Sequence, residues 1–398
     1  MPKQTHTIPL ATGTLTLNLE PGHIPLSRLL GFAARVSSKR KFLFVSKVLG
    51  KHYPVTPRMM SWSYRSLAKL ILQQYSGGAS VWLGMAETAT GLGYGVFEAA
   101  YSLGLRDSLF IQTTRYHLND QARLEFEEAH SHATDFFLYY PSDSLLREHF
   151  LNAQTLVLID DEISTGRTFL RLIKAYQQVN PSLQKVFIVS LVNFADPKDR
   201  MILSTEAGVV VNWVCLRQGT LHFEDRQNQQ LDAISVNVSS NNTCKQHLLN
   251  WPGRLGIKTP IALPDSIVTD LSTYFKSHDD PRPLLVLGSG ECNAPAYLLG
   301  RALAAQGFAV KVQSSTRSPI HPGNDIGYVE QFEDNYEDGI ANFLYNLPPN
   351  AYREIIWCHE TPLNAALLKQ MHVWQAISAR FVMDLPHSDH ATLYFSRP

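Results

Sequence analysis

Runs of apolar residues of strand length alternate with segments of helical periodicity along most of the chain. Residues 81–83 form one such run, and a glycine- and threonine-rich loop and a helical segment follow it. Residues 156–159 form another, again followed by a polar loop and a helical segment. Strands that alternate with helices in this way pack as parallel βαβ units. The sequence therefore predicts an α/β fold built around a parallel sheet.

The alternation is interrupted once, by a stretch rich in Ser, Asn, Pro and Gly, and then starts again. We interpret this stretch as a linker at 241–264, between a first domain at 1–240 and a second, smaller α/β domain at 265–398. A length of 398 residues agrees with two domains. We see no internal repeat in the sequence.

The overall composition argues against several classes of function. Lys plus Arg equals Asp plus Glu at 35 each, so no net charge attracts nucleic acid or an anionic membrane. The four cysteines are far apart and form no CxxC pair, which argues against a disulfide framework or a zinc knuckle. We see neither a signal peptide nor an apolar run long enough to span a membrane. We expect a cytoplasmic protein that binds neither nucleic acid nor membranes.

Paired carboxylates stand beside small hydroxyl residues in the stretch "TLVLIDDEISTGRTFLRLI", residues 155–173. Asp160 and Asp161 follow an apolar run, at the carboxyl end of a predicted strand, where α/β sheets bind ligands. The next helix begins among Ser164, Thr165, Gly166, Arg167 and Thr168. Backbone amides at a helix start, with hydroxyls and a glycine, form a phosphate cradle. The stretch predicts a sugar-phosphate site, and the alternative is a strand followed by a helix that the aspartates cap.

This stretch resembles the phosphoribosyl-pyrophosphate motif of type I phosphoribosyltransferases. The shared pattern is an apolar run, two acids, two further residues, two hydroxyl residues, Gly, any residue, and Ser or Thr. Glu162 departs from it, because that position is usually apolar, and it places a charge near the ribose. The resemblance implies the type I phosphoribosyltransferase fold, followed here by a Rossmann-like second domain. It also implies phosphoribosyl pyrophosphate as donor and Mg²⁺ held by Asp160 and Asp161.

In that family, an earlier strand ends in a loop that binds the pyrophosphate. Residues 84–90 have the matching place and composition, one βα unit upstream of the motif. The residues implied to contact the diphosphate are Met85, Ala86, Glu87 and Thr88. Three glycines follow, and helix-start flexibility explains them as well as ligand contact does.

The family also carries a mobile loop that closes over the reaction, between the second strand and the motif. Here that region includes Arg115, which we expect to face the diphosphate, and Glu128 and His130, which we expect to supply acid–base or metal contacts. The alternative is that this region forms a solvated helix face.

A basic run near the N-terminus is a candidate for holding the acceptor. Lys47 and Lys51 follow the apolar residues 42–45 and belong to the segment that forms a hood over the site in this family. The alternative is a solvated basic face.

The motif "SSTRSP", residues 314–319, identifies the second domain by resemblance. It resembles the TRSP module of bacterial two-domain proteins that are encoded with tellurium-resistance and stress-response operons. Strand-end residues there predict a second ligand site: Gly290, Glu291, Thr316, Arg317, Ser318 and Glu360. The alternative is that Arg317 and Glu360 form a structural ion pair at the domain interface.

Taken together, the resemblance implies a Mg²⁺-dependent phosphoribosyltransferase that acts on an unknown small-molecule acceptor. Its product would be a nucleotide- or nucleoside-like metabolite linked to tellurite or stress response, and the protein would form a homodimer. One alternative is a regulator that senses the donor and binds nucleic acid, which the balanced charge disfavours. Another is an enzyme that runs in reverse and cleaves a nucleotide.

Overall fold

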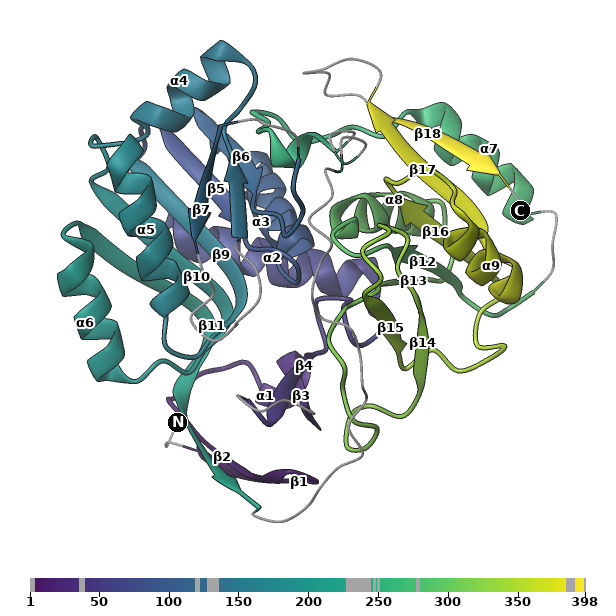
Figure 1. The fold of residues 1–398 in the computed structure, drawn as a ribbon, viewed down its shortest axis with the longest axis horizontal. Helices are drawn as coiled ribbons and strands as arrows, with labels where there is room; N and C mark the ends of the chain where they lie inside the picture. Colours follow the sequence, from purple (N-terminus) through teal and green to yellow (C-terminus); the bar gives the residue numbers. More distant parts are fainter. Residues whose placement is uncertain are drawn as a thin grey trace.

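The computed structural model describes residues 4–35, 40–118, 122–126, 136–226, 245, 248, 251–276, 280–383 and 391–396. Two β-sheets lie side by side, one in the N-terminal half (residues 4–226) and one in the C-terminal half (residues 251–396) (Figure 1). One hydrophobic cluster includes buried residues from both sheets, such as Val81 and Ile356, so the halves share a continuous core. The predicted α/β fold is confirmed.

The larger sheet has seven strands, and its centre is parallel. In spatial order they are β1 (Gln4–Leu10), β2 (Gly13–Leu19), β11 (Val210–Asp225), β10 (Lys185–Asn193), β9 (Thr155–Ile163), β5 (Ser80–Gly84) and β6 (Ser108–Gln112). Strands β11, β10, β9, β5 and β6 pair in parallel, and every residue of β5 and β6 is buried, as a sheet covered on both faces requires. The hairpin β1–β2 extends the sheet through antiparallel pairing of β2 with β11.

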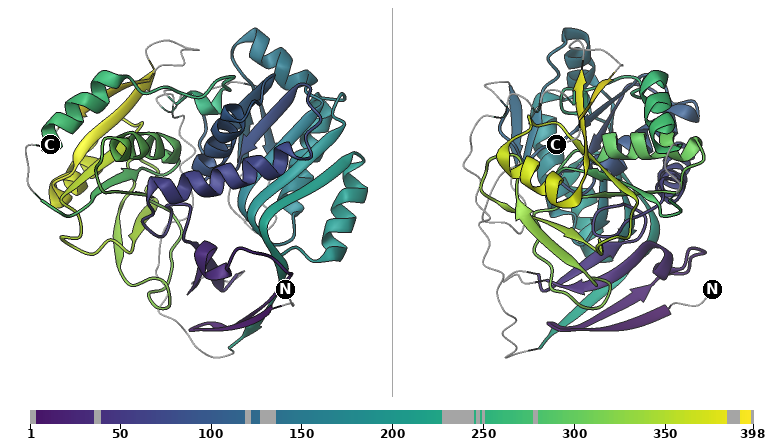
Figure 2. Two further views of the ribbon diagram at one scale, coloured as in Figure 1. Left: turned by 180° about the vertical axis from the view of Figure 1, so that it is seen from behind. Right: turned by 90° about the vertical axis from the view of Figure 1, so that its right-hand side faces the viewer.

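Helices connect these strands and cover the sheet. They are α1 (Leu26–Leu29), α2 (Pro57–Leu72), α3 (Thr90–Ser102), α4 (Ser144–Asn152), α5 (Arg167–Val179) and α6 (Pro197–Ala207). Thr56 caps α2 by accepting a hydrogen bond from the Met59 amide, and Pro57 occupies the first helical position. Helix α2 runs across the junction between the two sheets (Figure 2), where it contacts α3 and α8 (Asn293–Ala305).

Two short hairpins flank the larger sheet. One pairs β3 (Leu30–Ala34) with β4 (Phe42–Ser46), and the other pairs β7 (Arg123–Phe126) with β8 (Phe136–Tyr139). The alternative of a helix face in the second region is therefore wrong for 123–126, which form a strand.

The smaller sheet has five strands. In spatial order they are β13 (Val310–Ser314), β12 (Leu284–Gly288), β16 (Glu354–His359), β17 (Ile377–Met383) and β18 (Ala391–Ser396). The hairpin of β14 (Val329–Glu333) and β15 (Ala341–Tyr345) lies beside it, and α7 (Asp265–Lys276), α8 and α9 (Ala365–Trp374) complete this half. None of the helices among the described residues has the length and apolar character needed to cross a membrane.

Part of the segment interpreted as a linker packs against the larger sheet. Trp251 and Arg254 are buried, and Ile257 pairs with Phe110 at the edge strand β6. This segment therefore contributes to the interior between the halves. The domain boundaries themselves stay a prediction.

Candidate functional site

The two predicted acids lie side by side near the carboxyl end of β9. Asp160 and Asp161 are half-buried, and the Asp161 amide donates a hydrogen bond to Asp160 Oδ1 at 2.9 Å. Burial raises the pKa of both carboxyl groups, and the next acid along the chain raises each further. The negative charge of Asp161 raises the pKa of Asp160, and the negative charge of Glu162 raises the pKa of Asp161, which reaches about 7. Such a pair favours a ligand that supplies hydrogen-bond donors or a cation.

Glu162, which departs from the family pattern, has a protein partner. Its carboxylate accepts two hydrogen bonds from the guanidinium of Arg40, and the Arg40 Nη2–Glu162 Oε2 distance is 3.1 Å. The same guanidinium lies over the Phe42 ring, 4.5 Å from its centroid. Glu162 thus ties the end of β9 to the segment that precedes β4.

The predicted phosphate cradle forms the turn between β9 and α5. Gly166 caps α5 with a left-handed φ of 80°, and a Cβ there would lie 2.8 Å from Leu203 Cδ1. A larger residue at this position would therefore be strained. Ser164, Thr165 and Thr168 are half-buried and Arg167 is exposed. Helix α5 begins at Arg167, directly after this turn, and the backbone amides of its first turn are the groups that bind phosphate at a helix N-terminus.

The pair of aspartates is compatible with Mg²⁺. Among the described residues, no group of three or more His, Cys, Asp or Glu side chains could hold a metal ion. Mg²⁺ is commonly bound through one or two carboxylates, with substrate phosphates and water as the remaining ligands. Asp160 and Asp161 are the carboxylates that would hold a donor-bound Mg²⁺ here.

The predicted pyrophosphate loop follows β5 and is buried. The Met85 amide donates to Ile159 O at 3.0 Å, the Ala86 amide donates to Thr113 Oγ1 at 2.8 Å, and the peptide between Ala86 and Glu87 is cis. These bonds hold the start of the loop against β9 and β6.

Glu87 in this loop is held by two cations, one from each half of the chain. Lys51 Nζ lies 2.6 Å from Glu87 Oε1, and Arg317 Nε lies 3.2 Å from Oε2. Burial alone would raise the pKa of Glu87, but the charges of Lys51 and Arg317 outweigh it and lower that pKa to about 2. Lys51 also donates to the carbonyls of Gly290 and Ser315 in the C-terminal half.

The glycines after this loop are sites of close packing. A Cβ at Gly91 would lie 2.9 Å from Asn293 Cβ, and one at Gly93 would lie 2.5 Å from Gly84 Cα. One at Gly95 would lie 2.1 Å from the ring of an α2 tyrosine. Their small size brings α3 close to β5, α2 and α8.

Replacing Gly93 by alanine is expected to lower the free energy of unfolding by about 1–3 kcal/mol. The added methyl group meets backbone at Gly84, which cannot rotate away as a side chain would. Urea unfolding measures the change. Ser102→Ala, at the exposed end of the same helix, is the control, with an expected change within about 0.5 kcal/mol. Equal stability of Gly93→Ala and the wild type would contradict the packing argument.

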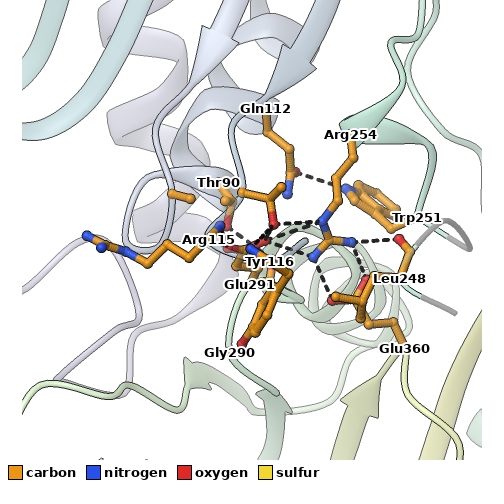
Figure 3. Close-up of polar contacts among 12 residues, drawn as sticks. Thr90, Gln112, Arg115, Tyr116, Leu248, Trp251, Arg254, Gly290, Glu291 and Glu360 are labelled. Atoms are coloured by element: carbon orange, nitrogen blue, oxygen red, sulfur yellow. Dashed lines mark hydrogen bonds and ion pairs between the residues drawn. The ribbon is translucent and has the colours of Figure 1, made fainter. Parts of the chain in front are cut away.

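A buried arginine that the sequence did not predict joins the predicted acids of the C-terminal half (Figure 3). Arg254 is fully buried, and its Nη2 lies 2.8 Å from Glu291 Oε2. Its Nη1 lies 2.5 Å from Glu360 Oε2. Burial lowers the pKa of Arg254, but the charges of Glu360 and then Glu291 outweigh it, so this pKa lies well above its usual value. The alternative pairing of Arg317 with Glu360 is wrong, since each has a different partner.

Glu291 also accepts hydrogen bonds from the N-terminal half. Thr114 Oγ1 donates to Glu291 Oε2 at 2.7 Å, and the Arg115 amide donates to Oε1 at 2.9 Å. The Arg115 guanidinium points away from this cluster and lies over the Phe136 ring, 4.4 Å from its centroid (Figure 3).

The other predicted residues are distributed around this junction. Lys47 pairs with Asp325 of the C-terminal half at 3.0 Å, and Thr316 is buried next to the half-buried Arg317 and Ser318. Glu128 and His130 lie outside the described residues. The structure therefore gathers Lys51, the 84–90 loop, Glu291, Arg317 and Glu360 at one junction. Asp160, Asp161 and the cradle lie together at the end of β9.

Solved phosphoribosyltransferases are similar to part of the chain. The adenine phosphoribosyl transferase from Trypanosoma brucei is 13% identical, over 47% of this chain and 76% of that chain, with a TM-score of 0.33. The enzyme from Giardia lamblia, complexed with 9-deazaadenine, is 18% identical over 48% and 94%, with a TM-score of 0.32. Orotate phosphoribosyltransferase from Mycobacterium tuberculosis H37Rv is 16% identical over 47% and 90%, with a TM-score of 0.28. No curated protein matches the sequence.

Family models match both halves of the chain. A model described as phosphoribosyl transferase matches residues 29–220, which contain the β9 acids and the cradle. A model described as the TRSP domain C-terminal to that transferase matches residues 251–374. The chain therefore contains a phosphoribosyltransferase region that is followed by a TRSP domain.

Proposed function

We propose that the protein transfers the phosphoribosyl group of phosphoribosyl pyrophosphate to a nitrogen of a small-molecule acceptor, with Mg²⁺ as cofactor. The observation that carries the proposal is the position of Asp160 and Asp161 directly before the 164–168 cradle, at the carboxyl end of a parallel strand. Acids and a phosphate cradle at this spacing match the two ends of a 5-phosphoribosyl group.

In the proposed reaction, the bond from C1 of the ribose to the pyrophosphate oxygen breaks and a bond from C1 to the acceptor nitrogen forms. Asp160 and Asp161 accept hydrogen bonds from the two ribose hydroxyls, and the amides at the start of α5 bind the 5′-phosphate. Arg115, whose guanidinium lies over the Phe136 ring, is the cation proposed to turn toward the departing pyrophosphate. Mg²⁺ supplies charge neutralisation to the diphosphate when bound. The protein thus contributes positioning and electrostatic stabilisation of a transition state with positive charge at C1.

Donor binding is expected to tighten as the pH rises from 6 to 8. The pKa of Asp161 is raised to about 7, so its carboxyl group is largely protonated at pH 6 and ionised at pH 8. The ionised form accepts hydrogen bonds and binds cations better, and affinity follows its population by up to about tenfold per pH unit below the pKa. Titration calorimetry at three pH values measures this. Asp161→Asn is the control, because it removes this carboxyl group while the phosphates of the donor still titrate. An identical pH dependence in both proteins would contradict the assignment.

The reaction itself is tested by pyrophosphate release. The protein is incubated with Mg²⁺, the donor and sets of nitrogen heterocycles, and mass spectrometry identifies any phosphoribosylated product. Acceptor-dependent release supports the proposal. Release without any acceptor would instead indicate a hydrolase.

The resemblance adds finer elements to the proposal. They are a nucleotide- or nucleoside-like product, a role in tellurite or stress response, a cytoplasmic location and a homodimer. Light scattering of the purified protein tests the last of these.

A further inference from the structure

The C-terminal half repeats the order of elements of the N-terminal half. A helix, α2 or α7, precedes a βαβ unit, which is β5-α3-β6 in one half and β12-α8-β13 in the other. A hairpin follows in each half, and then a second βαβ unit, which is β9-α5-β10 or β16-α9-β17. In the N-terminal half α4 stands between the hairpin and this unit, whereas residues 346–353 of the C-terminal half contain no helix. The central strand orders are β10-β9-β5-β6 and β17-β16-β12-β13, which are the same order. The two halves therefore share the order of their central strands.

The two halves also agree in strand register. Gly84 ends β5 and lies level with Ile159 of β9, while Gly288 ends β12 and lies level with Cys358 of β16. The two residues after Ile159 are the donor-site aspartates. Because the registers match, the two residues after Cys358 occupy the corresponding positions.

The turns after these strands form the same hydrogen bonds. The Ala86 amide donates to Thr113 Oγ1 at 2.8 Å, and the Gly290 amide donates to Ser315 Oγ at 2.9 Å. The residue after Thr113 and the residue after Ser315 are both threonines, and each pairs with a phenylalanine of the adjoining hairpin. An arginine follows each of these threonines. Equivalent strands, turns and side chains thus coincide at single-residue precision.

The halves contact each other reciprocally. Val55, which precedes α2, pairs with Val312 on the edge strand β13 of the C-terminal half. Ile257, which precedes α7, pairs with Phe110 on the edge strand β6 of the N-terminal half. Reciprocal pairing of equivalent segments is the signature of a twofold interface, here formed within one chain.

The acidic loop of each half is held by the other half. Glu87 is bound by Arg317, and its equivalent Glu291 is bound by Thr114 and the Arg115 amide. Each loop also has a cation from its own half. Lys51 binds Glu87, and Arg254 binds Glu291.

The C-terminal copy has lost the features of a donor site. In place of Asp160 and Asp161 it has His359 and Glu360, which are both buried. The His359 ring bonds to Thr361 O and to a serine hydroxyl of β17, and burial lowers its pKa to about 4. The carboxylate of Glu360 forms an ion pair with the buried Arg254.

The cradle is missing as well. The residues before α9 are Thr-Pro-Leu-Asn, without a glycine or a pair of hydroxyl residues. Asn364 uses its side chain to cap α9 by accepting from the Leu367 amide at 3.0 Å. This turn therefore does not present the groups that surround a 5′-phosphate in the N-terminal half.

We infer that the C-terminal half is a second copy of the transferase fold that no longer binds a donor and instead positions the donor loop of the first copy through Arg317. This inference rests on the proposed function for the identity of the donor. Arg317 is a positioning residue, because it acts on the 84–90 loop through Glu87. Among the described residues, both sides of this junction thus come from a single chain.

Hydrogen–deuterium exchange of the full-length protein tests the positioning role without any ligand. Arg317→Ala is expected to speed exchange in peptides that cover 85–91 by about tenfold or more, and Arg317→Lys, which keeps the charge, is expected to restore most of the protection. Arg301→Ala is the matched control. It removes a half-buried ion pair to Glu98 between the same halves and leaves the loop unchanged. Equal protection of 85–91 in Arg317→Ala and Arg301→Ala would overturn the inference.

Native mass spectrometry with phosphoribosyl pyrophosphate and Mg²⁺ then counts the donor sites. One donor per chain in the wild type, and none in Asp160→Asn/Asp161→Asn, supports a single site. Two per chain, or one remaining in the variant, would show that the second copy binds donor and would overturn the inference. No donor on the wild type would refute the proposed function, and the exchange experiment would still decide the role of Arg317.

Discussion

Replacing Asp160 and Asp161 together by asparagine is expected to lower kcat/KM for phosphoribosyl pyrophosphate by about 10²- to 10⁴-fold. In the proposed mechanism each carboxylate accepts a hydrogen bond from a ribose hydroxyl. Hydrogen bonds to charged groups contribute about 1.5–3 kcal/mol each, and about 1.4 kcal/mol corresponds to a tenfold change. Asparagine keeps the shape of the side chain but removes the charge that, in this mechanism, would orient the ribose and hold Mg²⁺. Steady-state kinetics of pyrophosphate release measure the loss.

The same variant is expected to be at least as stable as the wild type. The pKa values of both acids are raised in the folded protein, so their ionisation opposes folding as the pH rises above about 4. Asparagine does not ionise, so the variant lacks this unfavourable contribution to the free energy of folding. Thermal unfolding at pH 8 measures it, with Asp270→Asn on an exposed position of α7 as the control for loss of an acid. A variant that loses stability and activity in parallel would indicate a structural role for the pair and contradict the assignment.

Replacing Arg254 by methionine is expected to lower the free energy of unfolding by about 3–5 kcal/mol. The guanidinium and its two carboxylate partners are 0–1% exposed. Without the cation, Glu291 and Glu360 remain as buried, uncompensated charges between the two halves. Urea unfolding monitored by circular dichroism measures the change.

A triple variant separates the charge effect from the loss of packing. Arg254→Met combined with Glu291→Gln and Glu360→Gln removes the cation and both anions and keeps the side-chain volumes. It is expected to regain most of the stability lost by Arg254→Met alone, because a neutral cluster carries no unpaired charge. If the triple variant is no more stable than Arg254→Met, the lost stability comes from packing and not from charge.

The local features of the fold could be predicted from the sequence. Residues 81–83 and 284–287 are continuous apolar runs, and these runs lie in buried parallel strands. The acids, hydroxyls and glycine of 160–168 act within a few residues of one another, so their spacing alone indicates the strand, turn and helix. Gly166 is also a local signal, because this one residue forms the turn after β9 and caps the start of α5.

The contacts between the halves could not be predicted in this way. Arg254 lies in a polar segment that reads as a linker, and its partner Glu360 is 106 residues away along the chain. Lys51 is buried against Glu87, although its neighbours in the sequence suggest a solvated basic face. Burial of a charge depends on which segments meet in space, and spacing along one segment carries no information about that.

The repeat was hidden for a related reason. Leu-Gly-x-x-Glu at 83–87 recurs at 287–291, and Thr-Arg at 114–115 recurs at 316–317. These short matches lie at the turns, where geometry limits the choice of residue. Elsewhere the two copies share only apolar character, because buried positions accept many apolar residues of similar size.

The most direct test of the account is a calorimetric titration of the wild type and of Asp160→Asn/Asp161→Asn with phosphoribosyl pyrophosphate in the presence of Mg²⁺. The account predicts micromolar binding by the wild type that falls at least a hundredfold in the variant. Absence of binding by the wild type, or equal affinity in both proteins, would contradict a donor site at the end of β9.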